Sequence, residues 1–248
     1  MKAWPKLALI VLPAVLICAI GIWRIQVVRN RPGVLPPHAQ ESHLSDEQMV
    51  QPRKLYIDDL KSARDLIGKP AWVQAGYELD YFPYVAHHID FAHRAGVLPS
   101  IQQLDVHDIV TQKFPANLPT RIPRGTAQSF AVFTMPGDTK QYATPIGTMQ
   151  GSDSTYYCDN VFYYDDPHQM YKFWPADVWH AVDQHQPKAG MTELEVAMAL
   201  GVMQQSDSSN YGNRTVEYDA GGKHWAVTFE NDKATEIQQK PTTPSTAG

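Results

Sequence analysis

Histidines and an acid gather in one short stretch of the sequence that could hold a metal ion. The stretch HHIDFAH contains His87, His88, Asp90 and His93. Imidazole and carboxylate groups are common zinc ligands, although zinc enzymes usually carry the tighter H-E-x-x-H spacing on a helix. The candidate metal ligands are therefore His88, Asp90 and His93, and a metal-dependent enzyme is one alternative function. The loose spacing favours the other interpretation, a polar loop or helix edge.

Two further polar stretches, DDPHQMY (165–171) and HAVDQH (180–185), could face each other across a cleft. His180 and Asp183 would then lie opposite Asp165 and Asp166. The simpler interpretation is a helix start, because Asp166 is a good N-cap and the proline after it suits the first helical position.

The sequence carries no motif for nucleophilic catalysis or for nucleotide binding. Cys158 stands beside Asp159, and a neighbouring acid raises a thiol pKa, which is the wrong direction for a nucleophile. We expect Cys158 to be a buried filler. No G-x-S-x-G, P-loop or G-x-G-x-x-G pattern occurs. We therefore predict no catalytic residue, no cofactor-binding residue and no cofactor, and the sequence leans away from an enzyme.

The charge distribution argues against nucleic acid as a partner. The formal net charge is −5, and the first 31 residues hold five of the 21 Lys and Arg residues and none of the acids. The remaining chain is thus strongly acidic and shows no basic face of the kind that nucleic-acid binding needs.

The N-terminus predicts a membrane anchor over residues 1–28. Leu7 to Trp23 is an uncharged apolar run that would span about 25 Å as a helix. A cleaved signal peptide would need small residues after the run, and RIQVVRNRP offers none. Ile17 before Cys18 does not fit a lipobox. The flanking basic residues do not decide the orientation.

The sequence predicts an α+β fold in which a proline-rich linker (29–54) separates the anchor from a β-rich domain (55–173). A helix is expected around Asp58 to Ile67, with Gly68 and Pro70 as its stop. Short strands with turns between them suggest a small barrel, of SH3-like kind, or a sandwich. The predicted strands cover residues 71–85, 104–114, 127–135, 141–149 and 154–165.

A second module, residues 174–238, is predicted to hold two helices and a three-stranded antiparallel sheet, followed by a flexible tail (239–248). The helices are expected within 174–185 and 188–201, and the strands at 214–219, 223–232 and 233–238. Thr192 and Glu195 form a capping box, Met191 and Val196 fit a hydrophobic staple, and Gly201 suits the C-cap. These devices fix the ends of a short helix that only packing can stabilise.

The stretch GMTELEVAMALG (190–201) is similar to the G-M-T-x-x-x-V-x-x-x-x-G signature of the SmpA/OmlA family. That family comprises small bacterial envelope proteins, among them the E lipoprotein of the outer-membrane assembly machine. The similarity covers Pro175 to Gln238 and includes the helix–helix–three-strand layout. It implies an envelope location and a protein-binding role. The missing lipobox and the additional residues Leu55–Phe173 depart from the family, and no functional residue is carried over.

These observations lead to one expected function and two alternatives. We expect a bacterial envelope protein that acts by protein–protein binding, in envelope assembly or maintenance. It would be a single-pass inner-membrane protein, held by its N-terminal helix, with the C-terminal domain in the periplasm. A metal-dependent envelope enzyme using His87–His93 is the first alternative. A cell-wall binding module built on the aromatic stretches YELDYFPY and STYYCDNVFYYDD is the second.

Overall fold

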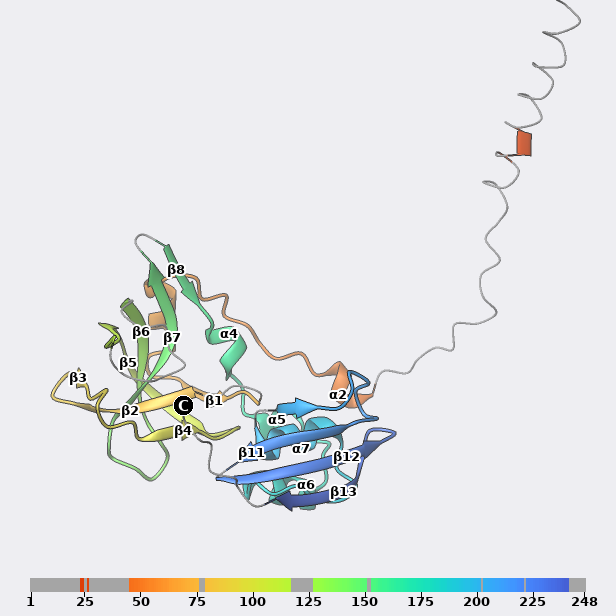
Figure 1. Cartoon of the computed structure of the whole chain (residues 1–248). Coiled ribbons are helices and arrows are strands. Elements are labelled where there is room, and N and C mark those ends of the chain that lie inside the picture. Colours follow the sequence, from red (N-terminus) through yellow and green to blue (C-terminus); the bar gives the residue numbers. More distant parts are fainter. Residues whose placement is uncertain are drawn as a thin grey trace, which may run out of the picture. The chain divides into compact units, whose positions relative to one another are not determined.

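The computed structural model (Figure 1) describes residues 23, 24, 26, 45–75, 79–116, 127–150, 153–201, 203–220 and 222–240. The chain divides into two compact units, Met1–Ser45 and Asp46–Gly248. The predicted anchor (1–28) lies outside the described residues except for Trp23, Arg24 and Gln26, which are helical. Within the described ranges, no helix is both long and apolar enough to cross a membrane.

The second unit begins with short helical segments, α2 (Asp46–Met49), α3 (Leu60–Ala63) and the 3₁₀ turn η1 (Arg64–Leu66). Asp59 caps α3, because its Oδ1 accepts a hydrogen bond from the Ser62 amide at 2.6 Å. Gly68, at φ 75°, ends the segment in the left-handed region that favours glycine. The helix expected before β1 is therefore confirmed, as one α-helical turn followed by a 3₁₀ turn.

A nine-stranded antiparallel sheet makes up the β-rich half (Figure 1). Its strands pair in the order β3-β2-β7-β6-β5-β1-β9, with β4 also on β2 and β8 also on β7. No pairing of the described strands joins the two ends of this path, as closure into a barrel would require. The bounds are β1 Pro70–Val73, β2 Leu79–Val85, β3 His88–Ile89, β4 Gly96–Leu98, β5 Gln103–Lys113, β6 Ala127–Thr134, β7 Tyr142–Gln150, β8 Asp153–Tyr156 and β9 Phe162–Tyr163.

The stretch 154–165, predicted as one strand, is divided, so that prediction was wrong. A helical turn, α4 (Cys158–Val161), separates β8 from β9. β8 pairs with β7, whereas β9 pairs with β1 at the other end of the strand order. The turn carries the chain between these two positions. The distant pairings of β8 and β9 outweigh the strand preference of the aromatics around the turn. The predicted strand 71–85 is likewise two strands, β1 and β2.

The C-terminal module places helices on one face of a four-stranded antiparallel sheet (Figure 1). The expected sheet had three strands; β10 adds a fourth, at the edge beside β11. Pro175 is the N-cap of α6. The bounds are α5 Pro167–Met170, α6 Ala176–Asp183, α7 Glu193–Leu200, β10 Met203–Ser206, β11 Thr215–Ala220, β12 Lys223–Glu230 and β13 Lys233–Lys240.

The predicted capping devices of α7 are confirmed. The Thr192 hydroxyl accepts from the Glu195 amide at 3.1 Å, and Glu195 Oε2 accepts from the Thr192 amide at 2.7 Å. Gly201 has φ 86°, and its amide donates to the Ala197 carbonyl at 2.8 Å. Met191 and Val196 are buried in the same apolar cluster, as a staple requires.

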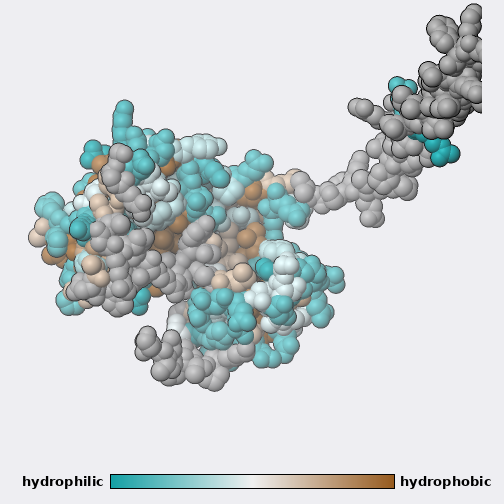
Figure 2. Space-filling view, turned by 45° about the horizontal axis from the view of Figure 1, so that its top comes forward, coloured by the Kyte–Doolittle hydropathy of each residue, from teal (hydrophilic) through white to brown (hydrophobic). Residues whose placement is uncertain are grey.

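The two halves of this unit share a core. Trp72, Ile101 and Tyr163 belong to the β-rich half but pack against the apolar cluster of the C-terminal module. Arg53 donates to the Tyr164 carbonyl of the β-rich half at 2.6 Å, and Glu47 accepts from the Trp174 indole of the C-terminal module. The segment before α3 therefore contacts both halves. Figure 2 shows mainly hydrophilic residues on the visible face, with hydrophobic residues appearing between them.

Candidate binding pocket

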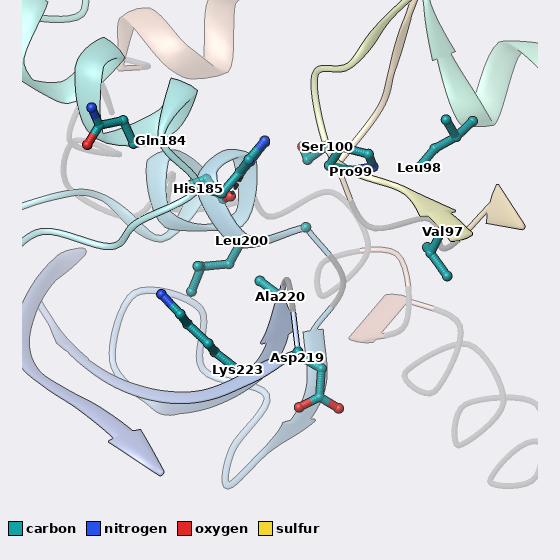
Figure 3. A pocket seen from close by; sticks show the side chains of 13 residues that line it. Val97, Leu98, Pro99, Ser100, Gln184, His185, Leu200, Asp219, Ala220 and Lys223 are labelled. Atoms are coloured by element: carbon teal, nitrogen blue, oxygen red, sulfur yellow. Dashed lines mark hydrogen bonds between the residues drawn. The ribbon is translucent and has the colours of Figure 1, made fainter. Parts of the chain in front are cut away.

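A pocket of about 610 Å³ lies where β4 and the turn after it meet the C-terminal module (Figure 3). This volume falls within the range of small-ligand sites. Three segments form its walls: the turn after β4, the ends of α6 and α7, and the β11–β12 hairpin. The lining residues are Val97, Leu98, Pro99, Ser100, Gln184, His185, Ala199, Leu200, Gly201, Asp219, Ala220, Gly222 and Lys223.

The first wall contains a buried hydroxyl. Ser100 is 6% exposed, and its Oγ is inaccessible to solvent and has no hydrogen-bond partner among the residues that the structure describes. The turn that carries it is fixed by Ile101, whose φ is 55° and whose amide donates to the Val73 carbonyl at 2.8 Å. An unpartnered buried hydroxyl costs about 1–3 kcal/mol.

The second wall contributes an imidazole. His185, with φ 52°, follows α6, and its Nδ1 lies 3.1 Å from the Ala199 carbonyl near the end of α7. A carbonyl can only accept, so Nδ1 carries the proton and Nε2 is an acceptor in the neutral ring. Gly201 lies close to Ser100, because a Cβ added to it would stand 3.8 Å from the Ser100 Cβ, an ordinary van der Waals contact.

The third wall contributes a cation. The Lys223 ammonium lies 6.0 Å from the centroid of the Trp225 ring, and no described carboxylate lies within salt-bridge distance of it. Asp219 is engaged elsewhere, since its Oδ1 lies 2.6 Å from His224 Nδ1. In Figure 3 the Lys223 side chain extends toward Leu200, whereas the Asp219 carboxylate points away.

These groups are suited to binding rather than to acyl transfer. Ser100 Oγ contacts no base among the residues that the structure describes, and an activated serine needs one within hydrogen-bond reach. The walls between the polar groups are aliphatic; Leu98 and Leu200 are 2% and 4% exposed. The pocket therefore offers an apolar body with a few fixed polar contacts, the usual character of a binding site.

The three predicted metal ligands do not come together as a set. His93 Nδ1 lies 2.8 Å from Asp90 Oδ2, but His88 Nδ1 lies 3.1 Å from the side chain of Gln112. Across the residues that the structure describes, no group of three or more His, Cys, Asp or Glu side chains is placed to hold a metal ion. Metal binding by His88, Asp90 and His93 stays a prediction.

Residues 86–88 belong to a tight hairpin between β2 and β3. Val85 pairs with His88, and the two residues between them, Ala86 and His87, have φ of 50° and 63°. Both therefore occupy the left-handed region, as a type I′ turn requires. The stretch is a turn and edge strand rather than a helix, which separates the side chains of its histidines.

The second polar cluster forms around a histidine that the sequence analysis did not single out. His168 Nδ1 lies 3.0 Å from Asp166 Oδ1, and its Nε2 lies 3.0 Å from Asp183 Oδ1. Its ring stacks on Trp179, with centroids 4.1 Å apart. Asp165 pairs with Arg53 instead, and His180 contacts Gln184. Asp166 caps α5 as predicted, so this cluster joins α5 to α6.

The aromatic stretches mainly supply core. Phe82, Tyr84, Phe162, Tyr163 and Tyr164 are all less than 9% exposed. Cys158 is also buried, and burial together with Asp159 raises the pKa of its thiol to about 12, which confirms its expected role as an inert filler. Cell-wall binding through an aromatic face stays a prediction.

Comparison with family models, curated proteins and solved structures found no match to this chain. The pocket therefore rests on geometry alone. Sequence reasoning missed Ser100, His185 and Lys223, because they lie far apart in the chain. The one local signal was the Gly221–Gly222 turn, which predicts a hairpin next to Lys223 but nothing about what faces it.

Proposed function

We propose that this chain is a membrane-anchored bacterial envelope protein that binds a partner protein in the pocket between its two halves. The anchor would be a single transmembrane helix within residues 1–28, in the inner membrane, with the C-terminal domain in the periplasm. Support for the location comes from the apolar run Leu7–Trp23 and from the likeness of residues 175–238 to the SmpA/OmlA family. Envelope assembly or maintenance is the setting that this likeness favours.

The observation that carries the binding role is the pocket of about 610 Å³, whose walls combine aliphatic side chains with the His185 imidazole and the Lys223 ammonium. Concave, largely apolar sites with a few polar groups are the usual places of ligand binding. The described contacts of the metal-ligand candidates do not favour the enzyme alternative over this role.

Site-specific photocross-linking tests the proposal. A benzophenone amino acid at Val97, on the pocket rim and 42% exposed, should form a covalent adduct with a partner protein in cells that make the chain. The matched control is Val85, which is 66% exposed in the β2–β3 hairpin and does not line this pocket. An adduct at Val85 but not at Val97, or no protein adduct at Val97, would contradict the proposal.

A further inference from the structure

Two open strand edges of the β-rich half lie next to each other. On the edge of β5 that faces away from β6, β1 pairs only with Gln103–Asp105, and the backbone of Lys69 continues this contact to Val106. The rest of that edge pairs with no described strand, and β3 pairs with β2 alone. The Gln112 side chain of β5 reaches β3, so the two open edges are neighbours. We call the space between β3 and residues 109–113 of β5 the seam.

Side-chain oxygens hold the strand amides at the seam. The Ile89 amide of β3 donates to Gln112 Oε1 at 3.2 Å, and the Ile109 amide of β5 donates to Asp108 Oδ1 at 2.8 Å. Gln112 Nε2 also lies 3.1 Å from His88 Nδ1. Inside a sheet, such amides donate to the carbonyls of a neighbouring strand. The Gln112 carboxamide therefore does for β3 what a peptide group of a further strand would do.

The backbone of β5 extends this edge. The Val106 amide donates to the Lys69 carbonyl, away from β6, and a β-bulge follows between Val106 and Asp108. After the bulge, the Ile109 amide is the one that the Asp108 side chain holds. Because successive residues of a strand direct their N–H and C=O groups to alternate edges, Thr111 and Lys113 share the direction of Ile109. The seam thus presents backbone groups at the spacing of a strand.

A second pocket, of about 490 Å³, lies beside the seam. Val85, Ile89 and Phe91 line it from the β2–β3 hairpin and the residues after it, and Pro115 lines it just after β5 ends. The Phe91 ring packs on the ring of Phe114, with centroids 4.9 Å apart, so this wall is fixed by the core. Val85 is 66% exposed. The pocket offers an apolar seat for a side chain directly beside the open edges.

The two features together indicate a ligand. Side-chain caps alone would serve only to protect an open edge against pairing. An apolar pocket beside the caps is not needed for protection, but it suits a strand whose alternate side chains point to one face. A lipid or a sugar lacks the alternating N–H and C=O groups that the two edges can bond.

We propose that the seam binds an extended segment of a partner polypeptide, which adds as a strand between β3 and β5 and places an apolar side chain in the second pocket. Gln112 would release the Ile89 amide to a carbonyl of this strand. Main-chain hydrogen bonds to a sheet edge, combined with pockets for alternate side chains, are an established mode of peptide recognition. The seam is a second binding surface, independent of the pocket between the two halves.

Fluorescent peptide pools test this inference on the full chain held in lipid nanodiscs. One pool consists of short peptides with blocked ends in which aliphatic and polar residues alternate. The matched pool has the same sequences with N-methyl groups on alternate amides, which removes strand N–H groups and keeps the side chains. We expect the first pool to bind and the methylated pool to bind at least about tenfold more weakly by fluorescence polarisation. Equal binding of the two pools, or no binding of the first, would overturn the inference.

Variants assign the binding to the seam. Thr111→Pro removes an N–H from the open edge of β5 and keeps the pairing with β6, since proline is tolerated where the N–H faces outward. Val85→Lys places a charge in the second pocket. Each should weaken the first pool about tenfold. The matched control is Val97→Lys, because Val97 is 42% exposed and lines the other pocket, and it should bind like the unchanged chain. Val85→Lys and Val97→Lys behaving alike would contradict the inference.

Further outcomes identify other occupants. A dimer of the full chain that Val85→Lys dissociates, with no peptide binding, would make a second copy the occupant and overturn the inference. Peptide binding that appears only after residues 117–126 are replaced by a Gly-Ser linker would make that segment the occupant and also overturn it.

The two binding surfaces can fail separately. Val85, the control position for the pocket between the halves, borders the seam, so a protein adduct at Val85 that differs in mass from the adduct at Val97 would support the seam. Peptide binding at the seam without an adduct at Val97 keeps this inference and removes the proposed function. An adduct at Val97 without peptide binding does the reverse.

Discussion

Glu47 lies within the predicted linker (29–54) and is hydrogen-bonded to the capping box of α7. Its Oε1 accepts from Trp174 Nε1 at 2.9 Å and from the Thr192 hydroxyl at 3.0 Å. Burial raises the pKa of Glu47, despite these two donors, and burial also raises the pKa of Glu195 in the same network. One carboxylate thus links α2, the residues before α6 and the N-terminus of α7.

The charge and the hydrogen-bond acceptor of Glu47 can be separated by two variants. Glu47→Gln keeps an oxygen that can accept both hydrogen bonds and removes the charge. A raised carboxyl pKa means that the folded state favours the protonated form, so the native protein loses stability as pH rises from about 4.5 through the folded pKa. The free energy of unfolding of Glu47→Gln, relative to the unchanged chain, should therefore increase from pH 4 to pH 7 in urea titrations.

Glu47→Ala is the matched comparison, and it should destabilise at every pH. It leaves the indole N–H of Trp174, which is 6% exposed, and the Thr192 hydroxyl without their acceptor. We expect a loss of about 1–3 kcal/mol in the same titrations. If Glu47→Gln and Glu47→Ala had the same pH-dependent effect, the proposed role of Glu47 as acceptor for Trp174 and Thr192 would be contradicted.

Hairpins show how far local sequence determines the elements. The β12–β13 turn uses Asn231 and Asp232 at φ 50° and 57°, and these residue types mark a turn in the sequence because they tolerate this region. The β2–β3 turn uses Ala86 and His87 in the same region and was missed, because neither residue marks a turn. The unpredicted strand β10 has the sequence MQQS, which carries little strand preference, so pairing with β11 determines its conformation.

Replacing the turn Ala86-His87 by Asn-Gly should stabilise the protein. Non-glycine residues in the left-handed region cost roughly 1–2 kcal/mol each, and Asn-Gly is the preferred pair for this turn. The extra unfolded-state entropy of glycine offsets part of the gain, so we expect about 1 kcal/mol in urea unfolding. Asn231→Ala, in the equivalent turn of the C-terminal sheet, should act in the opposite direction. An unchanged or lowered stability of the Asn-Gly variant would contradict the assigned turn.

Local signals also predicted most elements of the C-terminal module, because capping boxes and glycine stops act within a few residues. The division of 154–165 could not be predicted in this way. The helical turn at Cys158 exists because β8 and β9 pair with strands at distant positions in the sheet, and single-strand propensity carries no information about that. The same argument explains the pocket: Ser100 and Lys223 are 123 positions apart in the numbering and meet only through the packing of the two halves.

At the scale of the whole molecule, the joint between the two halves holds both shared core and the proposed binding pocket. Buried residues such as Tyr163 fix the β-rich half against the C-terminal module, and the pocket lies at the same joint. A buried ion pair joins the start of α7 to the residue before β11: Arg214 Nε donates to Glu193 Oε1 at 2.9 Å, and both side chains are largely buried. A pocket with fixed walls loses little conformational entropy when it binds a ligand.

The proposed location is tested by reporter fusions after Gly248. A reporter that folds only in the periplasm should be active, and one that works only in the cytoplasm should be inactive, because the proposed anchor places the C-terminal domain outside the inner membrane. Activity of the cytoplasmic reporter alone would remove the envelope location and, with it, the envelope partner.

Hydrogen exchange of the full chain, with and without the partner captured at Val97, tests the central claim most directly. If the partner binds between the two halves, amide exchange should slow at Val97, Leu98 and Ser100 and in the β11–β12 hairpin around Lys223, while the β2–β3 hairpin stays unchanged. Slower exchange at the β2–β3 hairpin with no change at the pocket would place the binding surface elsewhere and contradict the account.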